Sequence, residues 1–392
     1  MLLSRKIRLI PTPEQEELFW KSAGCARWAY NFFLYENIKS YNDYMCGNGT
    51  QKYLSGNSVR KMITDLKHTS HQWLKDVGCN VVKQAVTDAE IALKRFFLKT
   101  SGFPNYKSRK KSKPSFYVNY ESLHRRNGGF HGEKIGFVKT AETLPKLHKN
   151  QHYSNPRISY DGDYWWLSVS YEVCIDTSDT TGEVIGIDLG IKSLATLSNG
   201  KVYSNINKSD SIHRLECALK REQRKLSRMI ENNTESYKIT DNKRYPIYKR
   251  PLSECKNITK QKKKLRKLYR RMKNIRTDYL HKTTTEIVKT KPSRIVVEDL
   301  CVSGMMKNHR LSKAIQNSCF SKFLYQIEYK CELYSIEFVN VDRFYPSSKM
   351  CSNCKNIKSD LKLKDRTYKC DVCGLSVDRD FNASINLANY CI

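Results

Sequence analysis

The sequence predicts a multidomain α/β protein with a mixed β-sheet in its second half. Three observations lead to this prediction. Strand-like and helical segments alternate from residue 183 onward, single acidic residues interrupt or end two of the apolar strands, and two Cys-x-x-Cys pairs lie near the C-terminus. A chain of 392 residues can bury at least one sizeable core and has room for two or three domains.

The composition points to a polyanionic partner. The chain has 70 Lys and Arg against 39 Asp and Glu, a formal net charge of +31. Nucleic acid is the commonest polyanion that such an excess binds. No apolar run approaches the ~20 residues of a membrane-spanning helix and no signal peptide opens the chain, so we expect no membrane partner. Fourteen cysteines without a disulfide framework predict a reducing cytoplasm, with four thiolates on zinc and ten plain thiols.

The segment 12–114 is predicted to be mainly helical. Thr12 to Gln15 has the pattern of a capping box, in which Thr12 is the N-cap and Pro13 takes the first helical position. Apolar residues then recur at helical spacing, and residues 56–100 predict two more helices.

A basic run, Lys107 to Lys113, follows these helices. Such runs are usually solvated loops. Aromatic residues lie on both sides of this one, at Phe103, Tyr106 and Phe116, and they favour a phosphate contact instead.

Short strands separated by turns are expected from 115 to 174, the clearest of them at Tyr164 to Tyr171. They predict a β-barrel-like element. A polar linker, Asp176 to Thr181, connects this element to the second half of the chain.

The second half begins with a buried strand, Val184 to Gly190, that contains Asp188. Leu194 to Leu197 and Val202-Tyr203 are its expected antiparallel neighbours, because a turn-forming Asn199-Gly200 lies between them.

Two basic helices follow, with heptad-like apolar spacing over 212–229 and 258–279. Eleven Lys or Arg and no acid lie between residues 256 and 276. Such a face repels itself, which favours a bound polyanion. The polar linker between the helices, 231–255, is expected to be exposed or mobile.

The remaining elements complete the sheet. A strand at Arg294 to Glu298, a helix around 312–333 and a strand at 336–341 give the order β-β-β-α-β-α-β from residue 183 onward. This order matches a ribonuclease-H-like mixed sheet, followed by a zinc ribbon and a short final helix.

The two Cys-x-x-Cys pairs have the spacing C-x2-C-x15-C-x2-C. This is the spacing of a four-thiolate zinc site, and chance is a poor explanation for it. The zinc would be structural, since so short a segment folds only with metal. The ligands would be Cys351, Cys354, Cys370 and Cys373.

Three isolated acids, Asp188, Glu298 and Asp380, come from distant segments. A carboxylate in an apolar strand is costly unless it is paired or binds a cation. Together the three could hold two Mg²⁺ ions, because Mg²⁺ prefers hard oxygen ligands and such a pair of ions hydrolyses phosphodiesters. With the zinc ribbon, they suggest a metal-dependent nuclease.

Each acid also has a structural explanation. The amides of the Gly190 turn could satisfy Asp188, Asp299 could take the place of Glu298, and Asp378 or Asp380 could cap the last helix. Strand alternation favours Glu298 over Asp299, because residues 296 and 298 share a face.

These residues resemble the motifs of the TnpB family, proteins encoded by insertion sequences and related to the small type V CRISPR effectors. The resemblance covers the whole chain. It rests on Gly186-Ile187-Asp188-Leu189-Gly190, Val297-Glu298-Asp299-Leu300, Val341-Asp342-Arg343-Phe344-Tyr345-Pro346-Ser347-Ser348-Lys349, Asp378-Arg379-Asp380 with Asn382-Ala383, and more weakly on Arg8 to Thr12, Tyr30-Asn31 and Gly102-Phe103-Pro104.

The resemblance implies an RNA-guided DNA endonuclease with a RuvC-type nuclease domain, cytoplasmic and associated with the nucleoid. Its guide RNA would come from the transposon end, with one protein copy per RNA. It would cleave double-stranded DNA beside a short motif that the N-terminal half reads. Asp188, Glu298 and Asp380 would be the catalytic Mg²⁺ ligands.

The resemblance also implies four domains. These are a β-barrel-like wedge domain (1–11 and 115–180), a helical recognition domain (12–114), a RuvC-like nuclease domain (181–345 and 378–392) and a zinc ribbon (346–377) that contacts the target. Two features depart from the family pattern: the linker 231–255 is longer than usual, and Lys355 stands after Cys354 where the family commonly has Gly.

Three other functions are possible. An RNA-guided repressor without cleavage would be expected to have lost one of the acids, and all three are present. A strand-transfer transposase would need to bind transposon ends, and no segment resembles a helix-turn-helix followed by a nuclease core. A structural zinc-ribbon RNA-binding protein leaves Asp188 and Glu298 unexplained.

Overall fold

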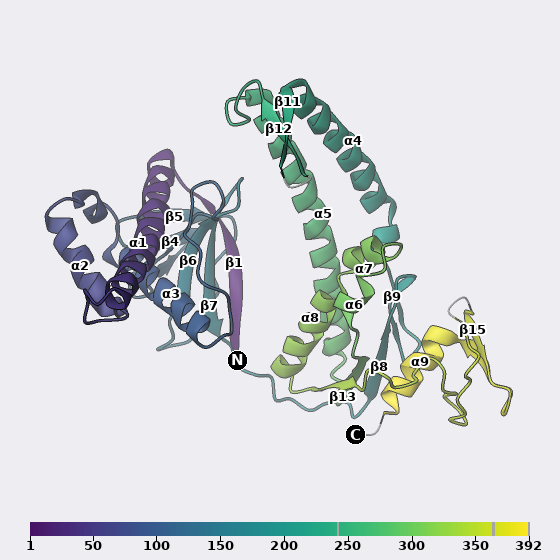
Figure 1. The fold of residues 1–392 in the computed structure, drawn as a ribbon. Coiled ribbons are helices and arrows are strands. Elements are labelled where there is room, and N and C mark those ends of the chain that lie inside the picture. The colour runs from purple at the N-terminus through teal and green to yellow at the C-terminus, as the bar shows by residue number, and fades with distance from the viewer. Residues whose placement is uncertain (241–242, 363–364, 391–392) are drawn as a thin grey trace. The chain divides into compact units, whose positions relative to one another are not determined.

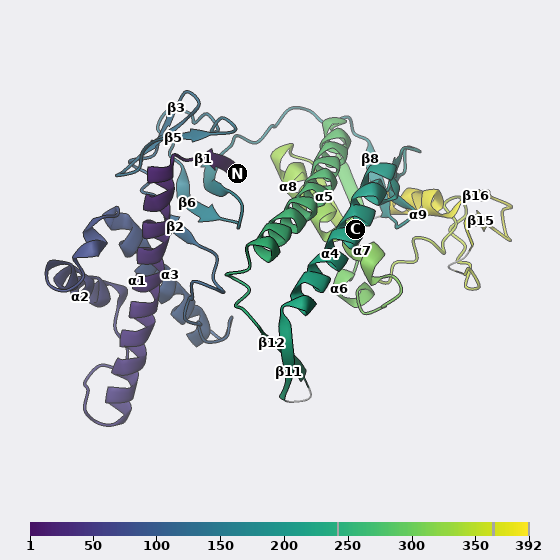
Figure 2. The same cartoon turned by 90° about the horizontal axis from the view of Figure 1, so that it is seen from above.

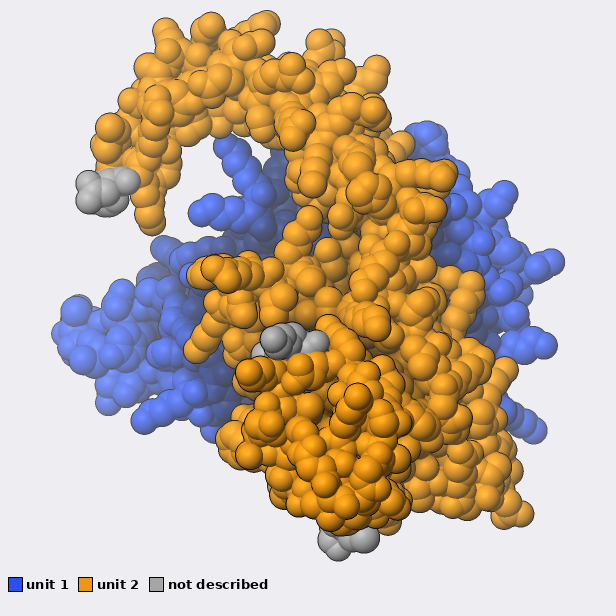
Figure 3. Space-filling model, turned by 90° about the vertical axis from the view of Figure 1, so that its right-hand side faces the viewer, with its two compact units in different colours: residues 1–173 blue, residues 174–392 orange. Residues whose placement is uncertain are grey.

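The computed structural model describes residues 1–240, 243–362 and 365–390, which form two compact units. Unit one comprises Met1–Val173 and unit two Cys174–Ile392, shown in blue and orange in Figure 3. Parts of three predicted segments lie outside the described residues: 241–242 of the linker, 363–364 of the zinc ribbon and 391–392 of the nuclease domain. No helix in the described part of the chain combines the length and apolar character needed to span a bilayer.

Unit one contains a seven-stranded sheet in which the N-terminal strand β1 (Leu2–Ile10) is central. β1 pairs antiparallel with β7 (Trp165–Glu172) on one side and β5 (Gly136–Thr140) on the other. The start of the chain therefore joins a sheet built otherwise from residues 115–172. The order is β2-β6-β7-β1-β5-β4-β3, with β2 at Ser115–Tyr117, β3 at His124–Arg126, β4 at Gly129–Gly132 and β6 at Ser154–Tyr160.

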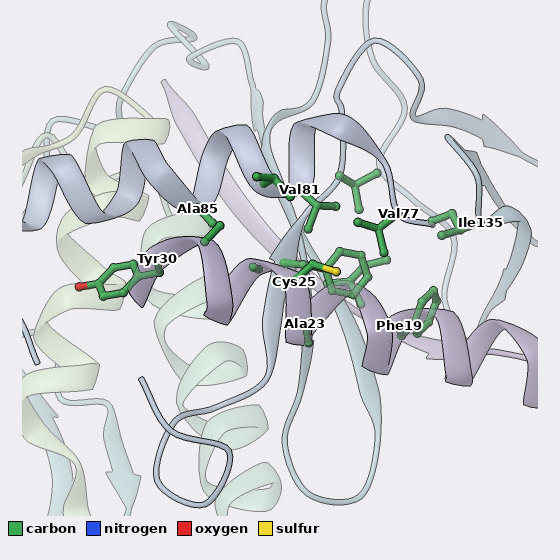
Figure 4. Close-up of a cluster of buried hydrophobic side chains, with 14 of the residues drawn as sticks. Phe19, Ala23, Cys25, Tyr30, Val77, Val81, Ala85 and Ile135 are labelled. Atoms are coloured by element: carbon green, nitrogen blue, oxygen red, sulfur yellow. The ribbon is translucent and has the colours of Figure 1, made fainter. Parts of the chain in front are cut away.

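The predicted helices of unit one are confirmed, and the capping box starts the first. The Gln15 backbone N–H donates to Thr12 Oγ1 at 3.3 Å, and the Thr12 N–H donates to Gln15 Oε1 at 3.1 Å. The helices are α1 (Pro13–Met45), α2 (Gly56–His68), the 3₁₀ turn η1 (Gln72–Lys75) and α3 (Cys79–Phe97). Side chains of α1 and α3, such as Ala23 and Ala85, meet in a buried core of unit one (Figure 4).

Unit two contains the predicted mixed sheet, in the order β10-β9-β8-β13-β14. The strand β8 pairs antiparallel with β9 and parallel with β13, which in turn pairs parallel with β14. The strands are β8 (Val184–Leu189), β9 (Ser193–Leu197), β10 (Val202–Ser204), β13 (Arg294–Glu298) and β14 (Glu337–Val341).

Helices cover both faces of this sheet. The helices α5 (Lys256–Lys289) and α8 (Phe320–Leu333) lie on one side, where Ile187 and Val297 are buried against them. The final helix α9 (Arg379–Ala388) lies on the other (Figures 1 and 2). The other helical segments of unit two are the 3₁₀ turn η2 (Ile206–Lys208), α4 (Asp210–Asn232), α6 (Val302–Met305) and α7 (Ser312–Ser318).

The predicted pair of basic helices is α4 and α5, which pack through Leu215, Leu219 and Leu265. Glu222 interrupts the heptad spacing of α4 because it has buried polar partners on α5. Gln261 Nε2 and Lys264 Nζ each donate to its carboxylate at 2.8 Å, and these hydrogen bonds lower the pKa of Glu222.

Two predicted segments differ in detail. The helix expected over 312–333 is broken at Cys319, which adopts a left-handed conformation (φ +55°), so Ile315 before the break and Phe320 after it are both buried. The predicted linker 231–255 contains a β-hairpin, β11 (Thr234–Thr240) and β12 (Lys243–Tyr248). Most of its side chains are exposed, as expected.

Candidate functional site

Two adjacent parallel strands place Asp188 and Glu298 side by side. Ile187 on β8 pairs with Val297 on β13, and the two acids are the next residues of their strands. Strand alternation turns Asp188 to the same face as Gly186, and Glu298 to the face of Val296. Val296 belongs to the core beneath α9, so both carboxylates lie on the α9 side of the sheet.

The close packing of α9 on β8 brings the third acid to this face. A Cβ atom at Gly186 would lie 2.0 Å from the Ser384 carbonyl oxygen and 2.4 Å from the Ala388 nitrogen. Only glycine permits this approach. Asp380 precedes Ser384 by four residues, so both lie on the same face of α9.

The Asp188 carboxylate interacts electrostatically with both other acids. Burial raises the pKa of Asp188 well above its usual value, and the nearby charges of Glu298 and Asp380 raise it further. Arg379 acts in the opposite direction, and its guanidinium lies 3.4 Å from the carboxylate of Asp380. The site therefore holds negative charge that one arginine only partly balances.

The three structural alternatives named for these acids do not account for them. The amide of Gly190 bonds elsewhere, Asp299 has a different partner, and Asp378 takes the N-cap position. The Gly190 amide donates to the Leu194 carbonyl oxygen at 3.3 Å. Asp299 forms an ion pair with Arg343 at 2.6 Å. Asp378 is the N-cap of α9, where it accepts hydrogen bonds from the backbone N–H groups of the two residues after Arg379.

The chemistry of the three acids fits a hard divalent cation. Among the described residues, the tight cluster of candidate metal ligands is formed by the four cysteines, and the acids do not form a second such cluster. Asp188, Glu298 and Asp380 supply only hard oxygen donors, which suits Mg²⁺.

A cleft of about 560 Å³ opens beside Glu298. Phe344 is 92% exposed at this cleft, although phenylalanine is usually buried. The lining of the cleft includes Glu298, Asp299, Cys301, Arg343, Phe344, Ser347, Lys349, Leu361, Lys362 and Arg379.

The four predicted zinc ligands do converge. Their Sγ atoms all lie within 4.8 Å of one another, and the Cys351–Cys373 and Cys354–Cys370 pairs are 3.5 Å apart. Tetrahedral zinc with bonds of about 2.3 Å requires sulfur atoms about 3.8 Å apart. A hydrogen bond with the Leu375 backbone contributes most to lowering the pKa of Cys373, to about 6, which favours the thiolate that binds metal.

Both cysteine knuckles have the same turn. The Lys355 N–H donates to the Cys351 carbonyl oxygen at 3.0 Å, and the Gly374 N–H donates to that of Cys370 at 3.1 Å. Both donors are left-handed, with φ of +63° for Lys355 and +73° for Gly374. The family departure at Lys355 therefore leaves the knuckle geometry intact.

Two buried asparagines of α9 hold the start of the ribbon. Asn382 Nδ2 donates to the Met350 carbonyl oxygen at 2.7 Å, and Asn386 Nδ2 donates to that of Ser347 at 2.8 Å. The hydroxyl of Ser347 donates in turn to Glu298 Oε1. The ribbon, α9 and the Glu298 carboxylate are thus linked through direct hydrogen bonds.

Three residues of this site were not predicted: Ser347, Arg379 and Asn386. Ser347 and Arg379 lie inside the motifs that carry the family resemblance, so their position was a usable signal. Asn386 has no such signal, because an asparagine in a short helix is usually exposed and its burial depends on the tertiary contact.

The basic run of unit one is anchored at its start. Asn31 accepts a hydrogen bond from the Lys107 backbone N–H and donates one to its carbonyl oxygen, both at 2.8 Å, and the Lys107 ammonium lies 3.6 Å from the centre of the Tyr30 ring. Arg109, Lys110 and Lys111 are exposed. The run therefore presents cations from a fixed base.

Comparison with known families gives three matches. A model described as "Probable transposase", of the OrfB type found in IS605 insertion sequences, matches residues 168–309, and a model described as "Cas12f1-like, TNB domain" matches residues 320–387. A model described as "Helix-turn-helix domain" matches residues 1–44, although the sequence was interpreted as having no helix-turn-helix ahead of the nuclease core. The structure describes all of these 44 residues, and they form β1 and one long helix.

Curated relatives match nearly the whole chain. A protein of Streptomyces pristinaespiralis is 31% identical over 97% of this chain and 87% of its own length. The InsQ protein of Escherichia coli K12 is 27% identical over 97% of this chain and 90% of its own. Both bear the name "Putative RNA-guided DNA endonuclease".

A solved structure shares the fold. The protein in a cryo-EM structure of a Cas12f1–sgRNA–target DNA complex superposes with a TM-score of 0.58 at 14% identity, over 99% of both chains. At this identity the similarity concerns the fold alone.

Proposed function

The chain belongs to the TnpB family of IS605-type insertion sequences, and on that premise we propose that it is an RNA-guided DNA endonuclease. It carries one guide RNA derived from the transposon end and cleaves double-stranded DNA beside a short adjacent motif. Asp188, Glu298 and Asp380 hold the Mg²⁺ ions of the reaction. The names of the relatives support the activity, and the site supports the residue roles.

The observation that carries this proposal is the convergence of three acids from distant segments on one face of the sheet. Asp188 lies on β8, Glu298 ends β13 and Asp380 begins α9, yet Glu298 and Asp380 both raise the pKa of Asp188. A fold gains no stability from gathering like charges in a partly buried place. A cation that binds there removes this repulsion, so the arrangement favours metal-dependent chemistry.

The chain's own residues orient the site. Mg²⁺, when bound, activates a water and stabilises the leaving oxygen of a phosphodiester. The hydroxyl of Ser347 fixes one oxygen of Glu298, and Arg379 holds Asp380. The open cleft beside Glu298 gives a DNA strand access to that carboxylate.

The charge of the molecule supports the RNA and DNA partners. Phosphate contacts from Lys and Arg provide affinity that is independent of sequence. Pairing between guide and target then supplies the specificity, and the protein needs to recognise only the shape and charge of the duplex. A chain with a net charge of +31 is suited to such sequence-independent contacts with phosphates.

A DNA strand-transfer transposase is the second candidate, because two family descriptions favour it. The structure of residues 1–44 argues against it, since one strand and one helix do not make a helix-turn-helix. A repressor without cleavage is third, because all three acids are present.

Co-expression with the DNA that flanks the gene tests the proposal. The purified protein is expected to carry a defined RNA, and with Mg²⁺ to cut a matching plasmid target beside one short motif from a randomised library. Bound RNA without cleavage would favour the repressor. Absence of any bound RNA would refute the proposal and favour the transposase.

A further inference from the structure

The hairpin of β11 and β12 lies at the end of α4 and α5 that is remote from the five-stranded sheet (Figures 1 and 2). Its two strands pair from Thr234↔Tyr248 to Thr240↔Lys243. An isolated two-stranded sheet is marginally stable in water, and this one exposes most of its side chains. A partner that covers it would supply the burial that it lacks.

One face of the hairpin combines apolar and cationic side chains. Tyr245 is 50% exposed and Ile247 46%, and strand alternation places both on the same face. Lys238 is the direct cross-strand partner of Tyr245 and so shares this face. Exposed apolar side chains rimmed by charges mark interaction sites.

The opposite face repeats this chemistry. Ile239 is 73% exposed, and the Arg244 guanidinium lies 3.8 Å from the centre of the Tyr237 ring. Both faces therefore offer flat or apolar groups next to cations.

The positive charge of the hairpin and of the adjoining helix favours a polyanion as the partner. Residues 234–250 contain five Lys or Arg against two acids, and the adjoining stretch 256–276 has eleven Lys or Arg and none. A basic protein surface is excluded by repulsion. A polyanion whose backbone alone is accessible would leave Tyr245 and Ile247 uncovered, so the partner must also present flat apolar groups.

We propose that the β11–β12 hairpin binds unpaired nucleotides of the RNA that this protein carries, an inference that rests on the proposed function. Bases of a single strand stack on exposed aromatic side chains while lysines hold the adjacent phosphates. A duplex hides its base faces and cannot stack on Tyr245 in this way. RNA is favoured over displaced DNA because the RNA is the polyanion that the protein carries before any target is bound, whereas a displaced DNA strand exists only after target binding.

The base of the hairpin allows a clean deletion. The Lys249 N–H donates to the Asn233 carbonyl oxygen at 2.8 Å, and Asn233 Nδ2 donates to the Arg250 carbonyl oxygen at 2.7 Å. The two ends are therefore adjacent, and Gly-Gly can replace residues 235–247 without separating α4 from α5. A double variant, Tyr245→Ser/Ile247→Ser, keeps the backbone and removes only the apolar surface.

Chemical footprinting of the RNA in the purified complex tests the proposal, with 2′-hydroxyl acylation and a single-strand-specific ribonuclease as probes. The deletion is expected to expose one run of unpaired nucleotides and to weaken RNA binding by about tenfold, the loss of roughly one stacked base. The double variant should expose the same run. The control Tyr325→Ser, which alters a 65% exposed tyrosine on α8, should change neither readout.

Other outcomes identify other occupants. Unchanged RNA footprints and affinities in both variants would overturn the proposal. If the variants changed only the permanganate reactivity of the displaced DNA strand, the hairpin would bind DNA and the RNA assignment would be wrong. A wild-type protein that carries no RNA would instead refute the proposed function, and this inference with it.

Discussion

Lys355 adopts an energetically unfavourable backbone conformation in the turn of the first cysteine knuckle. Its backbone is left-handed, a conformation that costs a residue with a Cβ about 1–2 kcal/mol. The equivalent position in the second knuckle is Gly374, which has no such penalty.

Replacement of Lys355 with glycine is therefore expected to stabilise the zinc ribbon. After the extra flexibility of glycine in the unfolded chain is subtracted, the gain is about 0.5–1 kcal/mol. A chelator competition that follows zinc release will measure it. The reciprocal variant Gly374→Lys should release zinc more readily, and equal zinc retention in both variants would contradict this account of the knuckles.

Lys330 gives a prediction about pH. Its ammonium is buried and donates only to uncharged oxygens, those of Thr284, Thr285 and the His281 backbone. Burial lowers the pKa of Lys330 from 10.5 to about 8. Between pH 8 and 10.5 the unfolded chain therefore binds a proton that the folded chain does not, so this residue's contribution to stability rises with pH in that window.

Thermal unfolding of the wild type and Lys330→Met at pH 7.5 and pH 10 tests this sign. Titrations of groups that Lys330 does not influence cancel in the difference between the two proteins. The stability of the wild type relative to the variant should be higher at pH 10. An identical difference at both pH values would show that Lys330 titrates normally.

At the scale of elements, the packing of α9 on β8 depends on Gly186. A methyl group there would collide with the backbone of α9 at Ser384 and Ala388. We expect Gly186→Ala to destabilise unit two by about 1–3 kcal/mol and to reduce cleavage, because α9 carries Asp380.

Gly24→Ala is the matched control for this substitution. Gly24 lies within α1 and a Cβ there meets nothing within 4 Å, so alanine should stabilise unit one by about 0.5–1 kcal/mol. Urea unfolding and a cleavage assay on both variants provide the comparison. Full activity in Gly186→Ala would mean that α9 need not lie where the structure places it.

Elements with strong local signals were predictable from the sequence. The capping box at Thr12, the strands around Asp188 and Glu298, and the knuckle spacing all appear where they were expected. The close approach at Gly186 was not predicted. The pairing of two distant backbones has no local signature.

The β11–β12 hairpin was missed for a physical reason. Its residues are mostly polar, and Pro246 within β12 argues against a strand. Proline is tolerated there because each strand of a two-stranded sheet has a free edge. The helix break at Cys319 was missed because cysteine gives no warning of a left-handed backbone.

At the scale of the whole molecule, loss of zinc should destabilise the ribbon and α9 in unit two and leave the folding of unit one unaffected. The ribbon meets α9 through Asn382 and Asn386, whereas Met1–Val173 has its own core. Removal of zinc should therefore disorder residues 346–377 and abolish cleavage.

Hydrogen exchange with and without a zinc chelator provides the measurement. Faster exchange is expected in the ribbon and α9, with unchanged protection in α1 and α3. Cys373→Ser should reproduce the effect without chelator. Loss of protection throughout unit one would show that the two units do not fold independently.

One substitution tests whether Asp188, Glu298 and Asp380 act together as the nuclease centre. Asp188→Asn preserves the size of the side chain and removes the negative carboxylate charge, which the charges of Glu298 and Asp380 disfavour. It should leave the bound RNA in place and lower the rate of cleavage by at least about a thousandfold, because the cations lose a ligand. Asp278→Asn, which alters an exposed ion pair with Lys282, is the control.

The most direct test is the cleavage rate of a matching plasmid with Mg²⁺ by the RNA-loaded wild type, Asp188→Asn and Asp278→Asn at equal RNA occupancy. We predict cleavage by the wild type and Asp278→Asn, and none by Asp188→Asn. Cleavage by Asp188→Asn at the wild-type rate would contradict the assignment of this site as the nuclease centre.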